Sequence, residues 1–133
     1  MATHKTNPST RIYERQTDVA TAVAMLEKEL EKRAIPIFAK FDHQKNAQGA
    51  NLKLRQTQVL VFGAPAVGTL LMQENQSIAF ELPLRMAIWE DEKGATCLAM
   101  PDMALLAEEY GLSGLPVIGK MQALLDELAA SIA

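Results

Sequence analysis

The chain of 133 residues has one cysteine, and it has no long apolar run. The lone Cys97 cannot form a disulfide within the chain, which is typical of a reducing compartment, so we expect a cytoplasmic protein. No stretch approaches the ~20 apolar residues of a membrane span, and the polar N-terminus lacks the apolar core of a secretory signal. We therefore expect no membrane among its partners.

Basic residues are neither in excess nor clustered. There are 13 Lys and Arg against 16 Asp and Glu, a net charge of −3. Binding to a phosphate backbone needs clustered basic side chains, so we expect no nucleic-acid partner. The only basic stretch in the middle of the chain is Lys53-Leu54-Arg55, which we interpret as a solvated strand face.

Metal ligands are also scarce. The candidates His4, His43 and Cys97 are far apart in the sequence, and a transition-metal site usually needs three or four such ligands. We predict no metal site. We interpret Cys97 as a small core residue rather than a nucleophile.

The composition is that of a globular protein, with 49% apolar and 22% charged residues. The length suits one domain. We expect residues 1–10 to be a flexible N-terminal segment and 11–133 to form a single domain.

Hydrophobic periodicity predicts the order of the elements. Strands are expected at 10–16, 35–41, 58–63 and 95–100, with a longer alternating run at 77–90 that Pro83 interrupts by an edge, bulge or corner. Helices are expected after a cap at Thr17 or Asp18, at 42–49, from Pro65, from Asp102 to Gly111, and after Ser113 or Gly114. Residues 91–94 should form a hairpin turn. This mixed order predicts the α+β class, a single two-layer domain with a mostly antiparallel or mixed sheet and the main helices on one face.

The stretch Phe41-Asp42-His43 ends a run that we expect to be a buried strand, and it supports two interpretations. Asp42 could orient the His43 imidazole, which would act as an acid, a base or a ligand. Alternatively, Asp42 caps the next helix by accepting the amides of Gln44 and Lys45. We favour the cap, because neighbouring residues in a strand point to opposite faces.

Two further motifs could bind a ligand. In "FGAPAVG" a glycine turn enters a helix, which favours an anion but lacks the Gly-Lys-Ser/Thr of a nucleotide loop. A bend at Pro83 could pair Glu81 with Arg85, whose planar fork makes it the best single anion donor. Trp89, further along, could stack on a ligand or fill a subunit interface.

Three motifs together resemble the domain of unknown function 302 family. They are Phe41-Asp42-His43 with Ala47, then Val59 to Gly63 with Pro65 and Gly68, and Leu82-Pro83-Leu84-Arg85 with Trp89. The resemblance implies a compact α+β fold, homodimers and no established activity. It also implies that Asp42, His43, Gly63, Pro65, Leu82, Pro83 and Arg85 gather around a cleft at one end of the sheet. Ala64 departs from the family, where a polar residue is frequent.

These observations lead to two hypotheses. The first is a module that binds a small anionic or polar ligand, through Asp42, His43, Gly63, Pro65, Gly68 and Arg85, with His43 and Asp42 as candidate catalytic residues. The second is a non-catalytic homodimeric interaction or structural protein that uses Trp89. The sequence identifies no cofactor, and it leaves enzymatic activity open.

Overall fold

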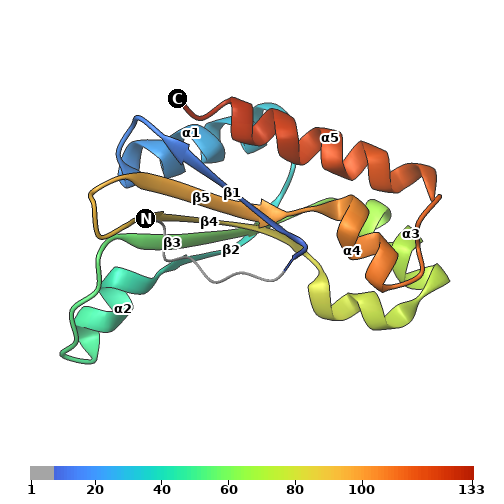
Figure 1. Cartoon of the computed structure of the whole chain (residues 1–133), viewed down its shortest axis with the longest axis horizontal. Helices are drawn as coiled ribbons and strands as arrows, with labels where there is room; N and C mark the ends of the chain where they lie inside the picture. Colours follow the sequence, from blue (N-terminus) through green and yellow to red (C-terminus); the bar gives the residue numbers. More distant parts are fainter. Residues whose placement is uncertain (1–7) are drawn as a thin grey trace.

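The computed structural model describes residues 8–133, and in that range five strands form one antiparallel sheet in the order β1-β5-β4-β3-β2 (Figure 1). The strands are β1 (Thr10–Arg15), β2 (Ile37–Asp42), β3 (Thr57–Phe62), β4 (Leu84–Glu90) and β5 (Thr96–Pro101). The helices are α1 (Val19–Lys32), α2 (His43–Gly49), α3 (Pro65–Glu74), η1 (Gln76–Glu81), α4 (Met103–Glu109) and α5 (Pro116–Ala130). The predicted α+β class is confirmed. Of the N-terminal segment, residues 1–7 with His4 lie outside the described range, whereas Thr10 already pairs with Pro101.

The two long helices cover one face of the sheet (Figure 1). Asp18 caps α1 by accepting the Thr21 amide, as predicted. One stripe of α1 and of α5 is apolar and buried against inward-facing residues of β3, β4 and β5. The fully enclosed side chains of this layer include Leu26, Leu30, Leu60, Phe62, Met86, Ile88, Leu98 and Leu125.

The face of the sheet opposite α1 and α5 is also largely apolar, and we call it the open face. Strand registers place small and branched apolar residues there, and in the described range no helix lies across its middle (Figure 1). Most are partly buried rather than enclosed. Its central members are Ile12, Ala39, Phe41, Val59, Val61, Ala87 and Ala99.

Strand β2 differs from the buried strand that we predicted. It forms one edge of the sheet, and Ile37, Phe38 and Phe41 remain exposed. A run of apolar residues indicates a strand, but it does not say on how many sides that strand has neighbours. A register shift between Ile37 and Ala39 also marks this edge.

The alternating run at 77–90 is two elements. Only the part after Pro83 is strand β4, and the part before it is the 3₁₀ helix η1. Ile78 is buried as expected, but Phe80 is exposed, because a turn of helix does not keep the two-residue period of a strand. The Leu82–Pro83 peptide bond is cis.

In the C-terminal half, the turns and helix ends lie close to where the sequence predicts them. Asp91 accepts the amides of Lys93 and Ala95 and so forms the β4–β5 hairpin turn. Asp102 caps α4, and Gly111, with φ of +69°, follows its end. The last helix begins at Pro116, after Leu115, rather than at Ser113 or Gly114. In α3, Leu71 is buried and Leu70 is exposed.

Candidate functional site

Asp42 and His43 lie where β2 passes into α2. The Asp42 Oδ1 atom accepts the Lys45 amide at 3.0 Å, which confirms the cap. His43 is the first residue of α2, and its exposed ring stacks on Phe41 with the ring planes 12° apart. Neither Asp42 nor His43 lines any of the three best-defined cavities in the described part of the chain.

The structure separates the predicted site residues into distant groups. Asp42 pairs with Gln58 at the start of β3, whereas Gly63 follows Phe62 at its end. At about 3.3 Å per residue, Gln58 and Gly63 are roughly 16 Å apart. Asp42 and His43 therefore do not join Gly63, Pro65 and Gly68 in one cleft. The cause is the antiparallel pairing, which places the end of β2 beside the start of β3.

Arg85 occupies a third location, on the open face opposite Val61. Its Nη2 atom is 3.9 Å from Glu81 Oε1, so the bend at Pro83 does bring the two charges together, although loosely. Tyr110 donates a hydrogen bond of 2.8 Å to Glu81 Oε2, and this bond raises the pKa of the Tyr110 phenol. Arg85 and Glu81 line a shallow groove of about 180 Å³.

Trp89 also projects from the open-face side of β4. It is paired with Thr57 on β3 and with Cys97 on β5, and it is half-buried. Its position fits the predicted role in an interface better than a role beside Arg85, because three residues of strand lie between the two.

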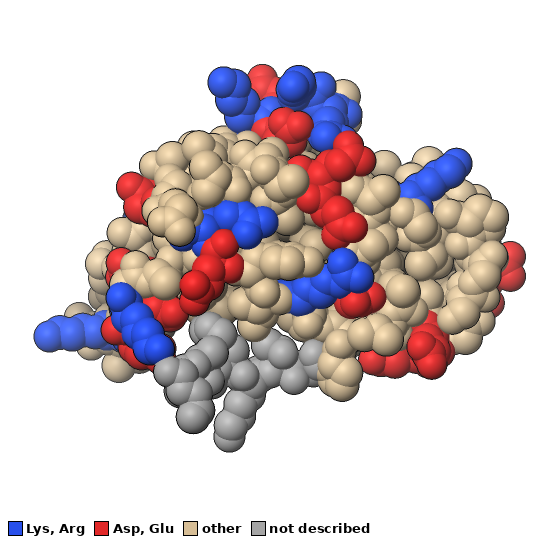
Figure 2. Space-filling view, turned by 45° about the horizontal axis from the view of Figure 1, so that its top comes forward, with Lys and Arg blue, Asp and Glu red and all other residues tan. Residues whose placement is uncertain are grey.

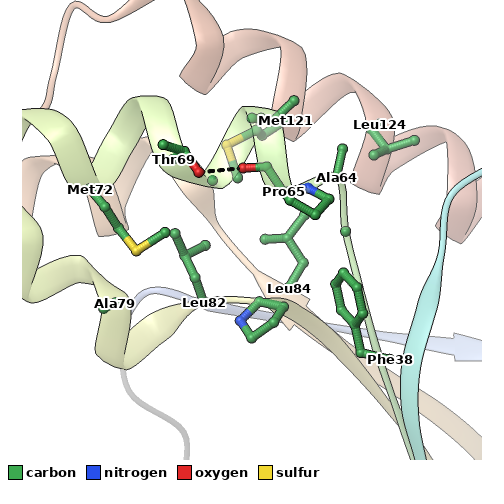
Figure 3. A pocket seen from close by; sticks show the side chains of 14 residues that line it. Phe38, Ala64, Pro65, Thr69, Met72, Ala79, Leu82, Leu84, Met121 and Leu124 are labelled. Carbon is green, nitrogen blue, oxygen red and sulfur yellow. Dashed lines mark hydrogen bonds between the residues drawn. The ribbon is translucent and has the colours of Figure 1, made fainter.

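The best-defined cavity in the described part of the chain lies at the other end of β3, around the glycine loop (Figure 3). It holds about 280 Å³ between α3, the Leu82–Pro83 turn and α5. Gly63, Pro65 and Gly68 line it, as three of the predicted ligand-binding residues. The other lining residues are Phe38, Ala64, Val67, Thr69, Met72, Ala79, Leu82, Pro83, Leu84, Met121 and Leu124.

The chemistry of this cavity is apolar. Thr69 carries the only polar side chain of the lining, and its hydroxyl already donates to the Pro65 carbonyl oxygen at 2.7 Å (Figure 3). An anion placed there would lose its water without gaining a charged partner, which is costly. The cavity therefore suits an uncharged apolar group.

Two glycines give the cavity its shape. Gly63 has φ of +151°, a conformation that side chains disfavour. A Cβ atom at Gly68 would lie 3.5 Å from Leu82 Cδ1 and 3.9 Å from Met72 Cε, an ordinary contact. A small residue at position 68 thus leaves space that a longer side chain would fill.

The sequence did not predict which residues of distant elements line the cavity. Phe38 comes from β2, while Met121 and Leu124 come from α5. Met121 and Leu124 lie on the apolar stripe of α5, but no pattern in one helix shows that its stripe ends over a cavity.

One cluster of possible metal ligands is present in the described range. Oxygen atoms of Glu14 and Asp91 and the Cys97 sulfur lie within 4.8 Å of one another. Burial, reinforced by the Asp91 carboxylate, raises the pKa of the Cys97 thiol to about 11. Metals bind the thiolate, and Asp91 Oδ1 already accepts two turn amides. We interpret this cluster as part of the hairpin turn.

Charged side chains of both signs are interspersed on the face shown in Figure 2. Within residues 8–133, several charged side chains form ion pairs, such as Arg11 with Asp102 at 2.8 Å and Arg33 with Glu127 at 3.0 Å. This face therefore offers no continuous basic surface.

Comparison with known proteins decides the family. The family model named "Domain of unknown function DUF302" matches residues 12–129. The chain belongs to the DUF302 family. This membership confirms the resemblance stated from the three motifs.

The fold of this DUF302 domain is shared with a solved relative. The crystal structure of an uncharacterized conserved protein DUF302 from Bacillus stearothermophilus matches with a TM-score of 0.73. The two chains are 18% identical, and the match covers 95% of this chain and 97% of that one. At this identity the likeness shows the fold alone.

Two longer relatives resemble this DUF302 domain over part of their length. Both are named "Fluoride-specific ion channel FluC 1", from Brucella suis biovar 1 and Brucella abortus biovar 1, and each is 33% identical over 99 residues. The match covers 74% of this chain but only 39% and 37% of these relatives. Within residues 8–133, no helix is both long and apolar enough to cross a bilayer.

Proposed function

We propose that this DUF302 domain binds a small, uncharged apolar molecule in the cavity between α3, the Leu82–Pro83 turn and α5. The observation that carries the proposal is the lining, which is apolar except for a Thr69 hydroxyl that is already hydrogen-bonded. An apolar cavity of about 150 Å³ holds a benzene-sized molecule. The cavity here, at about 280 Å³, leaves room for a two-ring or branched one.

This proposal changes the ligand class that the sequence suggested. A polar or anionic ligand was expected on the basis of Arg85, His43 and the loop amides. Arg85 lies on the open face, and His43 lies at the other end of β3. Neither supplies a charge to the cavity, so the lining supports an apolar ligand.

The relatives named as fluoride channels support a role as one unit of a larger assembly. The matched part makes up under two-fifths of those relatives. In such a protein, a domain of this kind could report the presence of its ligand to the remaining part of the protein. Fluoride itself is not the ligand that we propose, because a small anion gains nothing in an apolar cavity.

Filling the cavity should weaken binding. The neutral dye N-phenyl-1-naphthylamine is expected to bind the wild-type protein with enhanced fluorescence, and Gly68→Leu should weaken binding at least tenfold. Gly119 is the matched control, since it is also a helical glycine but has open space around its Cβ position. Gly119→Leu should leave dye binding unchanged.

The sulfonated analogue of the dye tests the ligand class. Stronger binding of 1-anilinonaphthalene-8-sulfonate, lost in Arg85→Ala and kept in Gly68→Leu, would replace our proposal with the polar ligand at Arg85. Equal loss in the Gly68→Leu and Gly119→Leu variants would also contradict the cavity as the binding site.

A homodimer that packs open face against open face is a second candidate function. The observation that favours it is the apolar centre of that face, where Val59, Ala87 and Ala99 lie side by side. Two such faces would bury each other as the two layers of a β-sandwich do. Trp89, on the same side of the sheet, would then lie in or beside the interface.

A charge placed on the open face tests this dimer. Ala99→Glu is expected to raise the dissociation constant of the dimer more than ~100-fold, because the interface would desolvate the added carboxylate. Arg85 lines the same groove as Ala99 but is already paired with Glu81. Ala123→Glu, at an exposed position of α5, is the control. Analytical ultracentrifugation gives both constants. A wild-type monomer at micromolar concentration would contradict the proposal.

A further inference from the structure

The end of β2 and the segment that joins it to β3 extend away from the rest of the protein. We call residues 40–55 the basic arm. Its helix, α2, contains no buried residue and lies beyond one end of the sheet, on the side away from α1 and α5 (Figure 1). Leu52 and Leu54 follow the helix, and 66% and 45% of their surfaces are exposed. Two large aliphatic side chains are thus presented to solvent on a protruding segment.

The arm has the opposite charge to the rest of the chain. It contains Lys40, Lys45, Lys53 and Arg55 against one acidic residue, Asp42, a formal charge of +3. The whole chain carries −3, so the remaining residues carry −6. The basic step at residues 53–55 was expected on a strand face, but it lies in the loop before β3.

Two of these cations are available to a partner. Lys40 pairs with Glu27 at 3.3 Å, and Arg55 donates to the Glu90 carbonyl oxygen at 3.2 Å. Lys45 and Lys53 make no ion pair with residues 8–133. The carboxylate of Asp42, three positions before Lys45, accepts the Lys45 backbone amide as a helix cap.

We propose that the basic arm docks on an anionic lipid surface. Leu52 and Leu54 would enter the boundary between headgroups and acyl chains, while Lys45 and Lys53 would meet the lipid phosphates and carboxylates. The arm would lie on the bilayer without crossing it. The sequence-based expectation of no membrane partner considered only spanning and secretory segments, which this docking does not need.

The shape of the arm favours a lipid surface over an acidic protein. A partner helix lays its apolar face into a groove. None of the three best-defined cavities among residues 8–133 is lined by a residue of the arm. A fluid bilayer requires no such groove. Nucleic acid would pair with the lysines but would gain little from two exposed leucines.

Vesicle co-sedimentation at low ionic strength tests the inference. The wild-type protein should bind vesicles of phosphatidylcholine with phosphatidylserine, bind pure phosphatidylcholine much more weakly, and be released by added salt. Lys45→Glu with Lys53→Glu should weaken binding at least tenfold, and so should Leu52→Ser with Leu54→Ser. The control Lys28→Glu with Lys120→Glu makes the same change in net charge on α1 and α5 and should have a much smaller effect.

Three results would overturn the inference. One is a wild-type protein that stays in solution with both kinds of vesicle. Another is an equal loss of binding in the arm variants and in the Lys28/Lys120 control. The third is binding to an acidic protein or a DNA duplex that needs the lysines but ignores the leucines. Circular dichroism of each variant checks that the fold is retained.

Discussion

Replacing Phe62 by alanine is expected to lower the free energy of unfolding by about 3–5 kcal/mol. Phe62 is fully buried at the end of β3, on the face that α1 and α5 cover. The substitution removes a large apolar side chain from a layer that cannot collapse to fill the space, since strands on one side and helices on the other fix its walls. Urea denaturation followed by circular dichroism measures the loss.

The chain supplies a matched control for this experiment. Phe80 is also a phenylalanine, but 81% of its surface is exposed, because η1 turns it away from the core. Phe80→Ala should change the free energy of unfolding by less than about 0.5 kcal/mol. Similar losses for the two variants would contradict the assignment of residues 76–81 to a helix with Phe80 outside the core.

Replacing Asp102 by alanine is expected to cost about 2 kcal/mol at neutral pH. The Asp102 carboxylate accepts the Leu105 amide at the start of α4 and forms an ion pair with Arg11 of β1 at 2.8 Å. The substitution removes the helix cap and leaves Arg11, among residues 8–133, with the more distant Asp126 as its ion-pair partner, at 3.4 Å. Thermal unfolding of the two proteins in the same buffer measures the cost.

The contribution of Asp102 should depend on pH in a defined direction. Burial raises the pKa of this carboxyl, but the hydrogen bonds from Arg11 and the Leu105 amide outweigh burial, so its pKa in the folded state is lowered. The stabilisation is therefore complete above the ordinary aspartate pKa of about 3.9 and is lost as the pH falls through the lowered value. The difference between wild type and variant should narrow below about pH 4.

Asp102→Asn separates the cap from the charge. Asparagine also caps helices well, so this variant should lose less stability than the alanine variant at pH 7. It should show the same narrowing at low pH, because it lacks the ionisable group. A gap between wild type and either variant that stays constant down to pH 2 would show that the Asp102 charge adds nothing to stability.

Local signals in the sequence predicted most of the elements because their causes are local. A carboxylate that caps the next helix needs only the two or three residues that follow it, as Asp18, Asp42 and Asp102 show. A proline at the first turn of α3 and a glycine after α4 act over equally short distances. The sequence alone therefore predicts these caps and helix ends.

The errors have a common cause. Residues 77–82 alternate as a strand would, but they form η1, where Ile78 is buried by packing while Phe80 is not. The run 35–41 is apolar as a buried strand would be, but β2 lies at an edge. In both places the sequence shows where the apolar residues are. Whether each of them is buried depends on neighbours that lie far away in the sequence.

The sequence by itself determined the α+β class, the caps, the β4–β5 hairpin and the DUF302 family. Only the tertiary structure decided how the candidate residues are grouped. Antiparallel pairing of β2 with β3 moves Asp42 and His43 away from Gly63, and the α5 stripe supplies Met121 and Leu124 to the cavity. The physical reason is range: caps and turns are set by interactions within a few residues, whereas a cavity is formed where segments distant in sequence come together.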